Sequence, residues 1–192
     1  MSENQDIILS PLEKDDYEQF IKDNQRSFKY GAFEEFGMRD NHFNKEGEII
    51  SRRTIEKSIN NKNSITYRII LNGKKVGGVI IKIDKEKKIG ELEILYINPE
   101  VHSKGIGFKT WNKIEKMYPE IDIWETFTPY FEKRNIHFYV NKCGFEIVEF
   151  FHKYHQLQFQ GNEDNEDNED IEEDDEGPDE MFRFQKIIRK KE

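Results

Sequence analysis

The feature that most constrains the fold is the way in which apolar segments are connected in the first half of the chain. Three such segments, 66–71, 76–83 and 91–97, follow one another through turns too short to hold a helix. The first turn contains Asn72-Gly73, which is typical of a type I′ hairpin because both central positions of that turn take positive φ. Strands joined by such turns pair antiparallel, so the sequence predicts a three-stranded meander.

The connections become longer in the second half of the chain. Residues 105–117 have the periodicity of an amphipathic helix, and 121–127 returns to the composition of a strand. A strand, a helix and a strand form a crossover, which makes the strands at 91–97 and 121–127 parallel neighbours. Residues 134–143 predict a second helix and 145–151 a further strand.

The two ends of the chain complete the expected fold. Apolar residues recur at helical intervals over 14–37, where Gly31 and Gly37 indicate two helices with a bend. The remaining elements are a strand at 7–12, a short helix at 54–60 and an alternating strand at 181–188. We expect an α/β (α+β) fold in a single domain over 1–192, with a mixed, mostly antiparallel sheet of about seven strands, a central parallel pair and helices on both faces.

Most of the negative charge lies in one segment. The sequence has 39 acidic and 30 basic residues, a formal net charge of −9, and residues 163–180 hold 13 of the acids and no Lys or Arg. Residues 161–178 are nearly devoid of apolar side chains and repeat Asn-Glu-Asp, which predicts a disordered acidic insertion in the last hairpin. The rest of the chain is mildly basic, which suits a polyphosphate ligand.

Several classes of protein are not expected from this sequence. The amino terminus lacks the basic and apolar regions of a signal peptide, and no stretch approaches the roughly 20 apolar residues of a membrane span. Cys143 is the single cysteine, so no internal disulfide forms and we expect a cytoplasmic protein. The histidines show no metal-ligand spacing, and a solvated helix face explains the lysines of 105–117. A metal, a membrane and a nucleic acid are therefore not among the expected partners.

A turn with small and basic residues precedes the helix at 105–117. It reads His102-Ser103-Lys104-Gly105-Ile106-Gly107. Backbone N–H groups at such a turn point into one concavity and the helix dipole adds positive potential, so the turn predicts an anion site. Gly105 and Gly107 would let phosphate oxygens approach the backbone. Glycines at a helix start are also common in plain turns, and neither the dinucleotide fingerprint nor a P-loop is complete here.

This turn and residues further along resemble the GNAT N-acetyltransferases. After its central strand that family carries Gln or Arg, two residues, Gly, one residue, and Gly or Ala; His102 stands here in the place of Gln or Arg. The second half of the family pattern is similar to Trp124-Glu125-Thr126-Phe127-Thr128-Pro129, Lys133-Arg134-Asn135, Phe138-Tyr139 and Gly144-Phe145. The resemblance is good over about 63–151, and the amino-terminal helices match by layout only.

The resemblance implies an acetyl-CoA site between the two parallel strands, which would splay apart at their carboxyl ends. The pantetheine arm would lie in that gap and the pyrophosphate on the turn, and no metal is implied. The implied acetyl-CoA contacts are Leu95, Tyr96, Ile97, His102, Ser103, Lys104, Gly105, Ile106, Gly107, Phe108, Lys109 and Asn135. Acetyl-CoA is thus the expected acetyl donor.

The resemblance also implies direct transfer of the acetyl group to an amine. A backbone N–H at the end of the strand at 91–97 would stabilise the oxyanion, and Tyr139 matches the tyrosine that protonates the leaving thiolate. Tyr139 stands five residues before Gly144, where the family usually has four, so the helix must accommodate one more residue. Glu93 and Glu125 are candidates for the base, and each is also explained as a solvated strand carboxylate.

The acceptor stays open between a small-molecule amine and a protein or peptide amine. The first helices carry aromatic and acidic side chains that would suit a cationic acceptor: Phe28, Tyr30, Phe33, Glu34, Glu35 and Phe36. The same side chains are also explained as the packed and exposed faces of one amphipathic helix. The acidic insertion is either a solubilising loop, a surface for a basic partner or a shield over the cofactor entrance. The alternative to an enzyme is a non-catalytic acyl-CoA-binding or interaction module on the same fold, and a homodimer is one assembly that the sequence leaves open.

Overall fold

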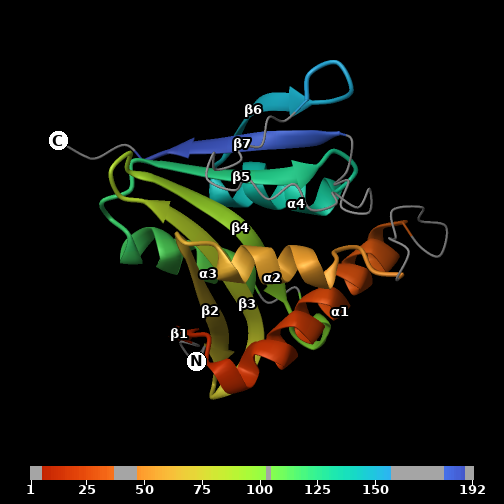
Figure 1. Cartoon of the computed structure of the whole chain (residues 1–192), viewed down its shortest axis with the longest axis vertical. Coiled ribbons are helices and arrows are strands. Elements are labelled where there is room, and N and C mark those ends of the chain that lie inside the picture. Colours follow the sequence, from red (N-terminus) through yellow and green to blue (C-terminus); the bar gives the residue numbers. More distant parts are fainter. Residues whose placement is uncertain (1–5, 37–46, 103–104, 157–179, 189–192) are drawn as a thin grey trace, which may run out of the picture.

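The computed structural model describes residues 6–36, 47–102, 105–156 and 180–188. Within them, seven strands form one sheet in the order β1-β2-β3-β4-β5-β7-β6 (Figure 1). The strands are β1 Ile7–Pro11, β2 Ser64–Leu71, β3 Lys74–Asp84, β4 Ile89–Ile97, β5 Ile123–Pro129, β6 Glu146–Phe151 and β7 Met181–Ile187. The helices are η1 Lys14–Asp16, α1 Tyr17–Phe36, α2 Arg52–Asn60, η3 Pro99–Val101, α3 Ile106–Met117, α4 Lys133–His137 and η4 Phe138–Cys143. None of these described helices has the length and apolar character needed to cross a membrane.

The pairing of the strands confirms the mixed, mostly antiparallel sheet. All neighbours are antiparallel except β4 and β5, which are parallel. The turn between β2 and β3 places Asn72 at φ 51° and Gly73 at φ 74°, as a type I′ hairpin requires. β6 pairs with β7, so the strands before and after the acidic segment form the last hairpin. The segment itself, 161–178, lies outside the described residues, and its disorder stays a prediction.

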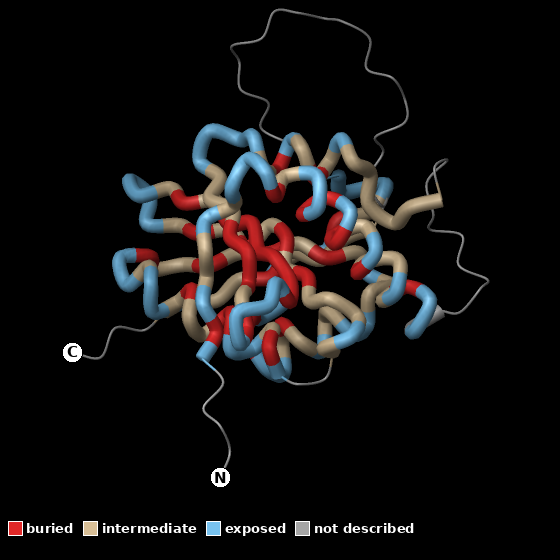
Figure 2. Tube along the Cα trace, turned by 90° about the horizontal axis from the view of Figure 1, so that it is seen from below, coloured by how far each residue is buried: buried red, intermediate tan, exposed pale blue. Residues whose placement is uncertain are grey.

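Helices cover both faces of the sheet, as expected. On one face α1 and α2 bury Phe20 and Ile55 against Ile94 of β4. On the other face α3 buries Trp111, whose ring lies edge-on to that of Trp124 of β5 with centroids 5.2 Å apart. Figure 1 shows α1 and α2 in front of the sheet and α3 behind it, and Figure 2 shows the buried residues gathered along the middle of the molecule. Removal of these apolar side chains from water is the main contribution that favours the fold.

The amino-terminal helical segment is one helix, so the predicted division into two bent helices is wrong. The 3-10 turn η1 leads directly into α1, which continues through Gly31. A glycine inside a helix costs only about 1 kcal/mol relative to alanine. Inward packing on both sides of Gly31, by Phe28 before it and Ala32 after it, outweighs that cost. Gly37, the second expected break, lies outside the described residues.

A buried ion cluster fixes α1 on the sheet. Arg68 of β2 is 2% exposed, and its guanidinium donates to Asp16 at 2.6 and 3.1 Å, to Asp23 at 3.0 Å and to the Tyr96 hydroxyl at 2.8 Å. Burial opposes the ionisation of Asp16, but the hydrogen bonds from Arg68 and Lys75 outweigh it and hold the pKa of Asp16 below its ordinary value. The first half of α1 is thereby tied to β2 and β4, which sets the position of the helix along the sheet.

Candidate active site

The parallel strands β4 and β5 separate after three paired positions. Residues 89–91 of β4 pair with 123–125 of β5, and no pair follows, although both strands continue. At the point of separation the Thr126 hydroxyl donates to the Leu92 carbonyl at 2.8 Å. Beyond Leu92 the facing edges of β4 and β5 no longer pair with each other. The backbone N–H and C=O groups along these edges are therefore open to an extended ligand. The structure therefore confirms the splayed parallel pair.

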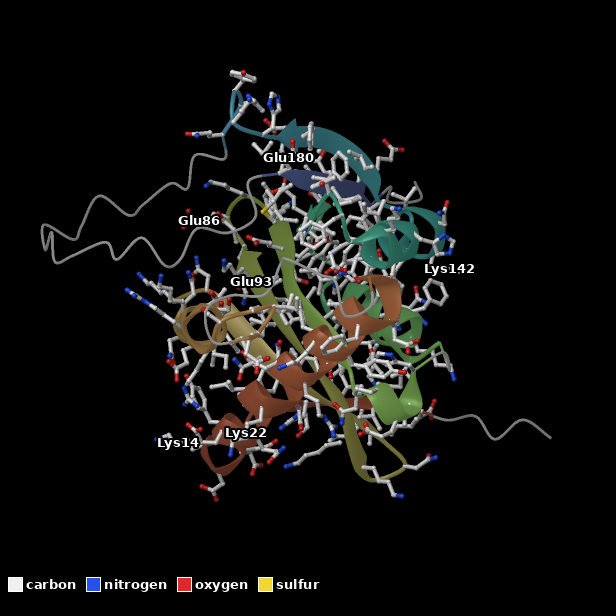
Figure 3. The ribbon with its side chains drawn as sticks, turned by 90° about the vertical axis from the view of Figure 1, so that its right-hand side faces the viewer. Lys14, Lys22, Glu86, Glu93, Lys142 and Glu180 are labelled. Atoms are coloured by element: carbon white, nitrogen blue, oxygen red, sulfur yellow. The ribbon has the colours of Figure 1, made fainter. Side chains whose placement is uncertain are left out.

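A β-bulge in β4 redirects its side chains at the same point. Ile80 of β3 pairs with Ile94, but Ile81 pairs with Leu92, which leaves Glu93 as the extra residue. Leu92 packs on the α3 side, whereas Glu93 contacts α2 and Ile94 packs against α1 and α2. The bulge thus interrupts the alternation of side chains, so that Glu93 and Ile94 both lie on the face opposite α3, and Figure 3 shows Glu93 on the sheet beside α2.

The glycine turn enters α3 in a conformation that suits an anion. Gly105 is the N-cap of α3 at φ 69°, a left-handed conformation in which a residue with a Cβ is strained. The first N–H groups of an α-helix have no carbonyl partner within the helix, so they are available to a ligand. A Cβ on Gly107 would lie 3.4 Å from the Phe138 ring, which shows that η4 packs closely against the start of α3.

The side chains around this turn differ in what they can contact. Ile106 is 3% exposed in an apolar cluster with β1, so only its backbone can reach a ligand. Phe108 and Lys109 are exposed on the first turn of α3. Ser103 and Lys104 lie outside the described residues, so their predicted contacts stay predictions.

His102 is held between the two sides of the gap. Its Nε2 lies 2.6 Å from the Ile97 carbonyl, and its Nδ1 lies 3.1 Å from a guanidinium nitrogen of Arg134 on α4. Because a guanidinium only donates and a carbonyl only accepts, the ring is the neutral tautomer with its hydrogen on Nε2. Burial lowers the pKa of His102 and the Arg134 charge adds to this, while the Ile97 carbonyl, Glu100 and Glu34 oppose it.

The helix that carries Tyr139 accommodates the additional residue by widening. Phe138–Cys143 form a π-helix, and the N–H of Gly144, at φ 78°, donates to the Tyr139 carbonyl. Tyr139 is 8% exposed, and its hydroxyl shares hydrogen bonds with Thr126 and Thr128 of β5. Burial raises the pKa of Tyr139 to about 12. The phenol is therefore protonated at neutral pH and lies on the β5 side of the gap.

Both carboxylates that the sequence selects as bases are engaged in ion pairs. Glu93 accepts from the Ser58 hydroxyl at 2.7 Å and from Lys82 at 2.9 Å. Glu125 accepts from Arg183 at 3.0 Å. These contacts occupy oxygen lone pairs that a base would use. One Glu93 oxygen stays buried and has no hydrogen-bond partner among the described residues.

Glu91, which the sequence analysis did not select, lies between these two carboxylates. It pairs across the sheet with Glu125, its closest cation is Lys82 at 3.9 Å, and none of the hydrogen bonds among the described residues uses its side chain. Burial raises the pKa of Glu91; Lys82 opposes this shift, while Glu93 and Glu125 add to it. A carboxylate with a raised pKa and available oxygens suits proton abstraction better than one held by two donors. No group of three or more His, Cys, Asp or Glu that could hold a metal ion occurs in the described part of the chain.

The remaining predicted acetyl-CoA contacts line the two sides of the gap. Leu95 and Ile97 are partly buried against apolar clusters. Tyr96 is 3% exposed and its hydroxyl binds Arg68, so only its backbone is available to a ligand. Asn135 on α4 donates to Glu132 at 3.4 Å. The structure thus brings β4 and the start of α3 to one side, and α4 with η4 to the other.

The aromatic residues expected beside an acceptor divide into two groups. Phe28 packs into the apolar cluster under α1 and is part of the core. Tyr30 and Phe33 are 37% and 38% exposed, and the Tyr30 ring lies edge-on to that of His102 with centroids 5.3 Å apart. Glu34 is exposed, while the side chains of Glu35 and Phe36 lie outside the described residues.

The fold, the splayed strands and the glycine turn together define a protein of the GNAT class. The chain belongs to the Acetyltransferase (GNAT) family, whose pattern matches residues 18–145. It is also 39% identical over 189 residues to the uncharacterized protein YrkN of Bacillus subtilis (strain 168), a match that covers 97% of this chain and 96% of that protein.

Solved structures with the same fold include N-acetyltransferases from other organisms. One is the PaiA N-acetyltransferase from Thermoplasma acidophilum in complex with coenzyme A, with a TM-score of 0.60, 18% identity and 95% and 99% of the two chains covered. Another is the ribosomal-protein-S18-alanine N-acetyltransferase from Escherichia coli, with a TM-score of 0.63, 12% identity and 97% of each chain covered. At these identities the similarity shows the fold and leaves the acceptor of this chain undefined.

Proposed function

We propose that the protein transfers an acetyl group from acetyl-CoA directly to an amine. The observation that carries this proposal is the gap between β4 and β5, with the glycine turn and the start of α3 at its wide end and the buried Tyr139 hydroxyl on its side. Membership of the GNAT family and the coenzyme A bound to a neighbour of the same fold support the same ligand.

Acetyl-CoA would bind with its pyrophosphate at the start of α3. The N–H groups of 105–108 would face the phosphate oxygens, and the positive φ of Gly105 is what lets the chain turn there. The pantetheine amides would pair with the open edge of β4 at 95–97, in the way that an extended peptide adds to a sheet edge. Asn135 on α4 would hold the arm from the opposite side.

Bound in this gap, acetyl-CoA supplies an activated thioester, and residues of the chain manage the protons. Glu91 would accept a proton from the incoming ammonium group, directly or through water, and so provide a neutral amine that attacks the thioester carbon. A backbone N–H of β4 would donate to the carbonyl oxygen as negative charge develops there. The new C–N bond forms, the C–S bond breaks, and Tyr139 donates its phenolic hydrogen to the departing sulfur. The second proton then leaves the nitrogen of the new amide and passes through water to restore the phenol of Tyr139.

The raised pKa of Tyr139 is consistent with this role. A phenol with a pKa of about 12 is a weak acid, and a thiol in water has a pKa near 8.5, so complete transfer between them would be unfavourable in water. The burial that raises the pKa of the phenol also disfavours a thiolate in the same gap, which raises the pKa of the thiol. The two values therefore move closer together where the reaction would occur.

The charge distribution supports a cationic acceptor on the α1 and α2 face. Glu91, Glu93 and Glu125 lie together there against Lys82 and Arg183, so the carboxylates outnumber the cations around the point where the strands separate. Such a surface attracts a protonated amine, and the exposed aromatic side chains of α1 are suited to contact it. A small-molecule amine and a peptide amine both fit this description.

The release of free coenzyme A thiol tests the proposal. Purified protein would be mixed with acetyl-CoA and a panel of amines (polyamines, amino acid amides and short peptides), beside the Tyr139→Phe variant, with mass spectrometry of each acceptor. We expect amine-dependent thiol release and a gain of one acetyl group on at least one amine. If acetyl-CoA binds but no amine yields thiol or product, the chain is a non-catalytic acyl-CoA-binding module; if acetyl-CoA does not bind, both functions are wrong.

A further inference from the structure

We propose that Arg134 is a ligand of the acetyl-CoA pyrophosphate and takes over the phosphate contact that the family assigns to the position of His102. This inference rests on the proposed function, because it names a residue of the same acetyl-CoA site. It starts from the one position at which the phosphate turn departs from the family pattern, where His102 replaces Gln or Arg.

The hydrogen bonds of His102 prevent it from donating to a phosphate. Its Nε2 hydrogen is directed to the Ile97 carbonyl at 2.6 Å, and its Nδ1 accepts from Arg134 at 3.1 Å. A neutral imidazole has one N–H donor, and here that donor is used within the chain. The ring therefore serves as a support for the guanidinium and does not replace Gln or Arg as a phosphate donor.

The packing of α4 and η4 brings Arg134 to the start of α3. Phe138 lies four residues after Arg134, so the two side chains project from the same side of the continuous helical segment. Phe138 packs at Gly107, within the first turn of α3, and Arg134 contacts His102 at the start of the phosphate turn. The guanidinium is thus held beside the helix N-terminus, where a phosphate is favoured.

The charges around this position are compatible with an anion. Two acids, Glu100 on η3 and Glu34 on α1, act on His102, and Glu100 is paired with Arg26 at 2.9 Å. Arg134 is exposed, so a ligand can reach it from solvent. Guanidinium groups bind phosphate through two parallel hydrogen bonds, and the bond to a neutral imidazole is easily exchanged for a charge-assisted one.

Calorimetric titration of coenzyme A into the full-length protein tests the proposal. The variants are Arg134→Gln, Arg134→Lys and, as a matched control one residue away with the same loss of charge, Lys133→Gln. We expect Arg134→Gln to weaken coenzyme A binding by about 10- to 100-fold, Arg134→Lys to recover part of that loss, and Lys133→Gln to change affinity by less than about threefold. The same titrations with dephospho-coenzyme A, which keeps the pyrophosphate but lacks the 3′-phosphate, should show the same loss for Arg134→Gln.

Four results would overturn this assignment. Equal losses for Arg134→Gln and Lys133→Gln would mean that only overall charge matters. A loss that disappears with dephospho-coenzyme A would place Arg134 at the 3′-phosphate. Unchanged coenzyme A affinity in Arg134→Gln, with wild-type binding intact, would show that Arg134 is not part of the site and would leave the proposed function standing. Absence of coenzyme A binding by the wild-type protein would instead refute both the assignment of Arg134 and the proposed function.

Discussion

Replacement of Tyr139 by phenylalanine separates the structural from the catalytic role of its hydroxyl. The change removes hydrogen bonds to Thr126 and Thr128 from a side chain that is 8% exposed. Each lost bond costs about 0.5–1.5 kcal/mol, so we expect a loss of about 2 kcal/mol in stability. In a domain of this size, that corresponds to a fall of about 4–8 °C in Tm. The effect on acetyl transfer should be larger, because a positioned general acid contributes about 10²- to 10⁴-fold to the rate.

The assay compares three quantities in Tyr139→Phe and in Thr128→Val. The second variant loses one of the same hydrogen bonds but keeps the phenol. We expect kcat to fall by about 10²-fold or more in Tyr139→Phe and by less than about tenfold in Thr128→Val. The Tm shift should be about half as large in Thr128→Val, and coenzyme A affinity should be unchanged in both variants. Equal losses of kcat in the two variants, or a Tyr139→Phe variant within about threefold of wild type, would refute the assignment of Tyr139 as the acid.

Three further predictions concern the base, the turn and the ion cluster. Glu91→Gln should lower kcat/KM by about 10²-fold. A carboxyl with a raised pKa must be ionised to accept a proton, so the activity of the wild type should fall as pH falls through that pKa, and this fall should be absent from the variant. An intact acidic limb in the pH–rate profile of Glu91→Gln would point to another base. Gly105→Ala should weaken coenzyme A binding more than Gly105→Asn does in the same titration, because asparagine tolerates positive φ. Equal coenzyme A affinities of the two variants would show that the turn conformation is not needed for binding. Arg68→Met leaves the buried Asp23 without its cation and Asp16 with Lys75 alone, and should cost about 3–5 kcal/mol in urea unfolding; a loss under about 1 kcal/mol would show that the cluster is not coupled to stability.

Local signals made much of the fold predictable from the sequence. The Asn72-Gly73 turn needs positive φ at two adjacent positions, and few residue pairs provide that. The crossover through 105–117 forces a parallel pair, and the family pattern locates the phosphate turn at its start. The spacing between Tyr139 and Gly144 even indicated an irregular helix, which the structure shows to be a π-helix.

Features that depend on contacts between distant segments were not predictable. Arg68 reads in the sequence as an ordinary strand residue, and only the packing of α1 on β2 places Asp16 and Asp23 around it. Glu91 becomes distinctive because the register of β4 and β5 sets it opposite Glu125, and register is not visible in either segment alone. The role of Gly31 was misjudged for the same reason, since packing on both sides of it outweighs its low helix propensity.

A crystal structure of the protein with coenzyme A tests the central claim most directly. The account predicts that the pantetheine arm lies between β4 and β5 beside 95–97, that the pyrophosphate contacts the N–H groups of 105–108, and that the sulfur lies within hydrogen-bonding distance of the Tyr139 hydroxyl. A complex in which coenzyme A is bound elsewhere and the gap between the strands is closed by side chains would contradict it.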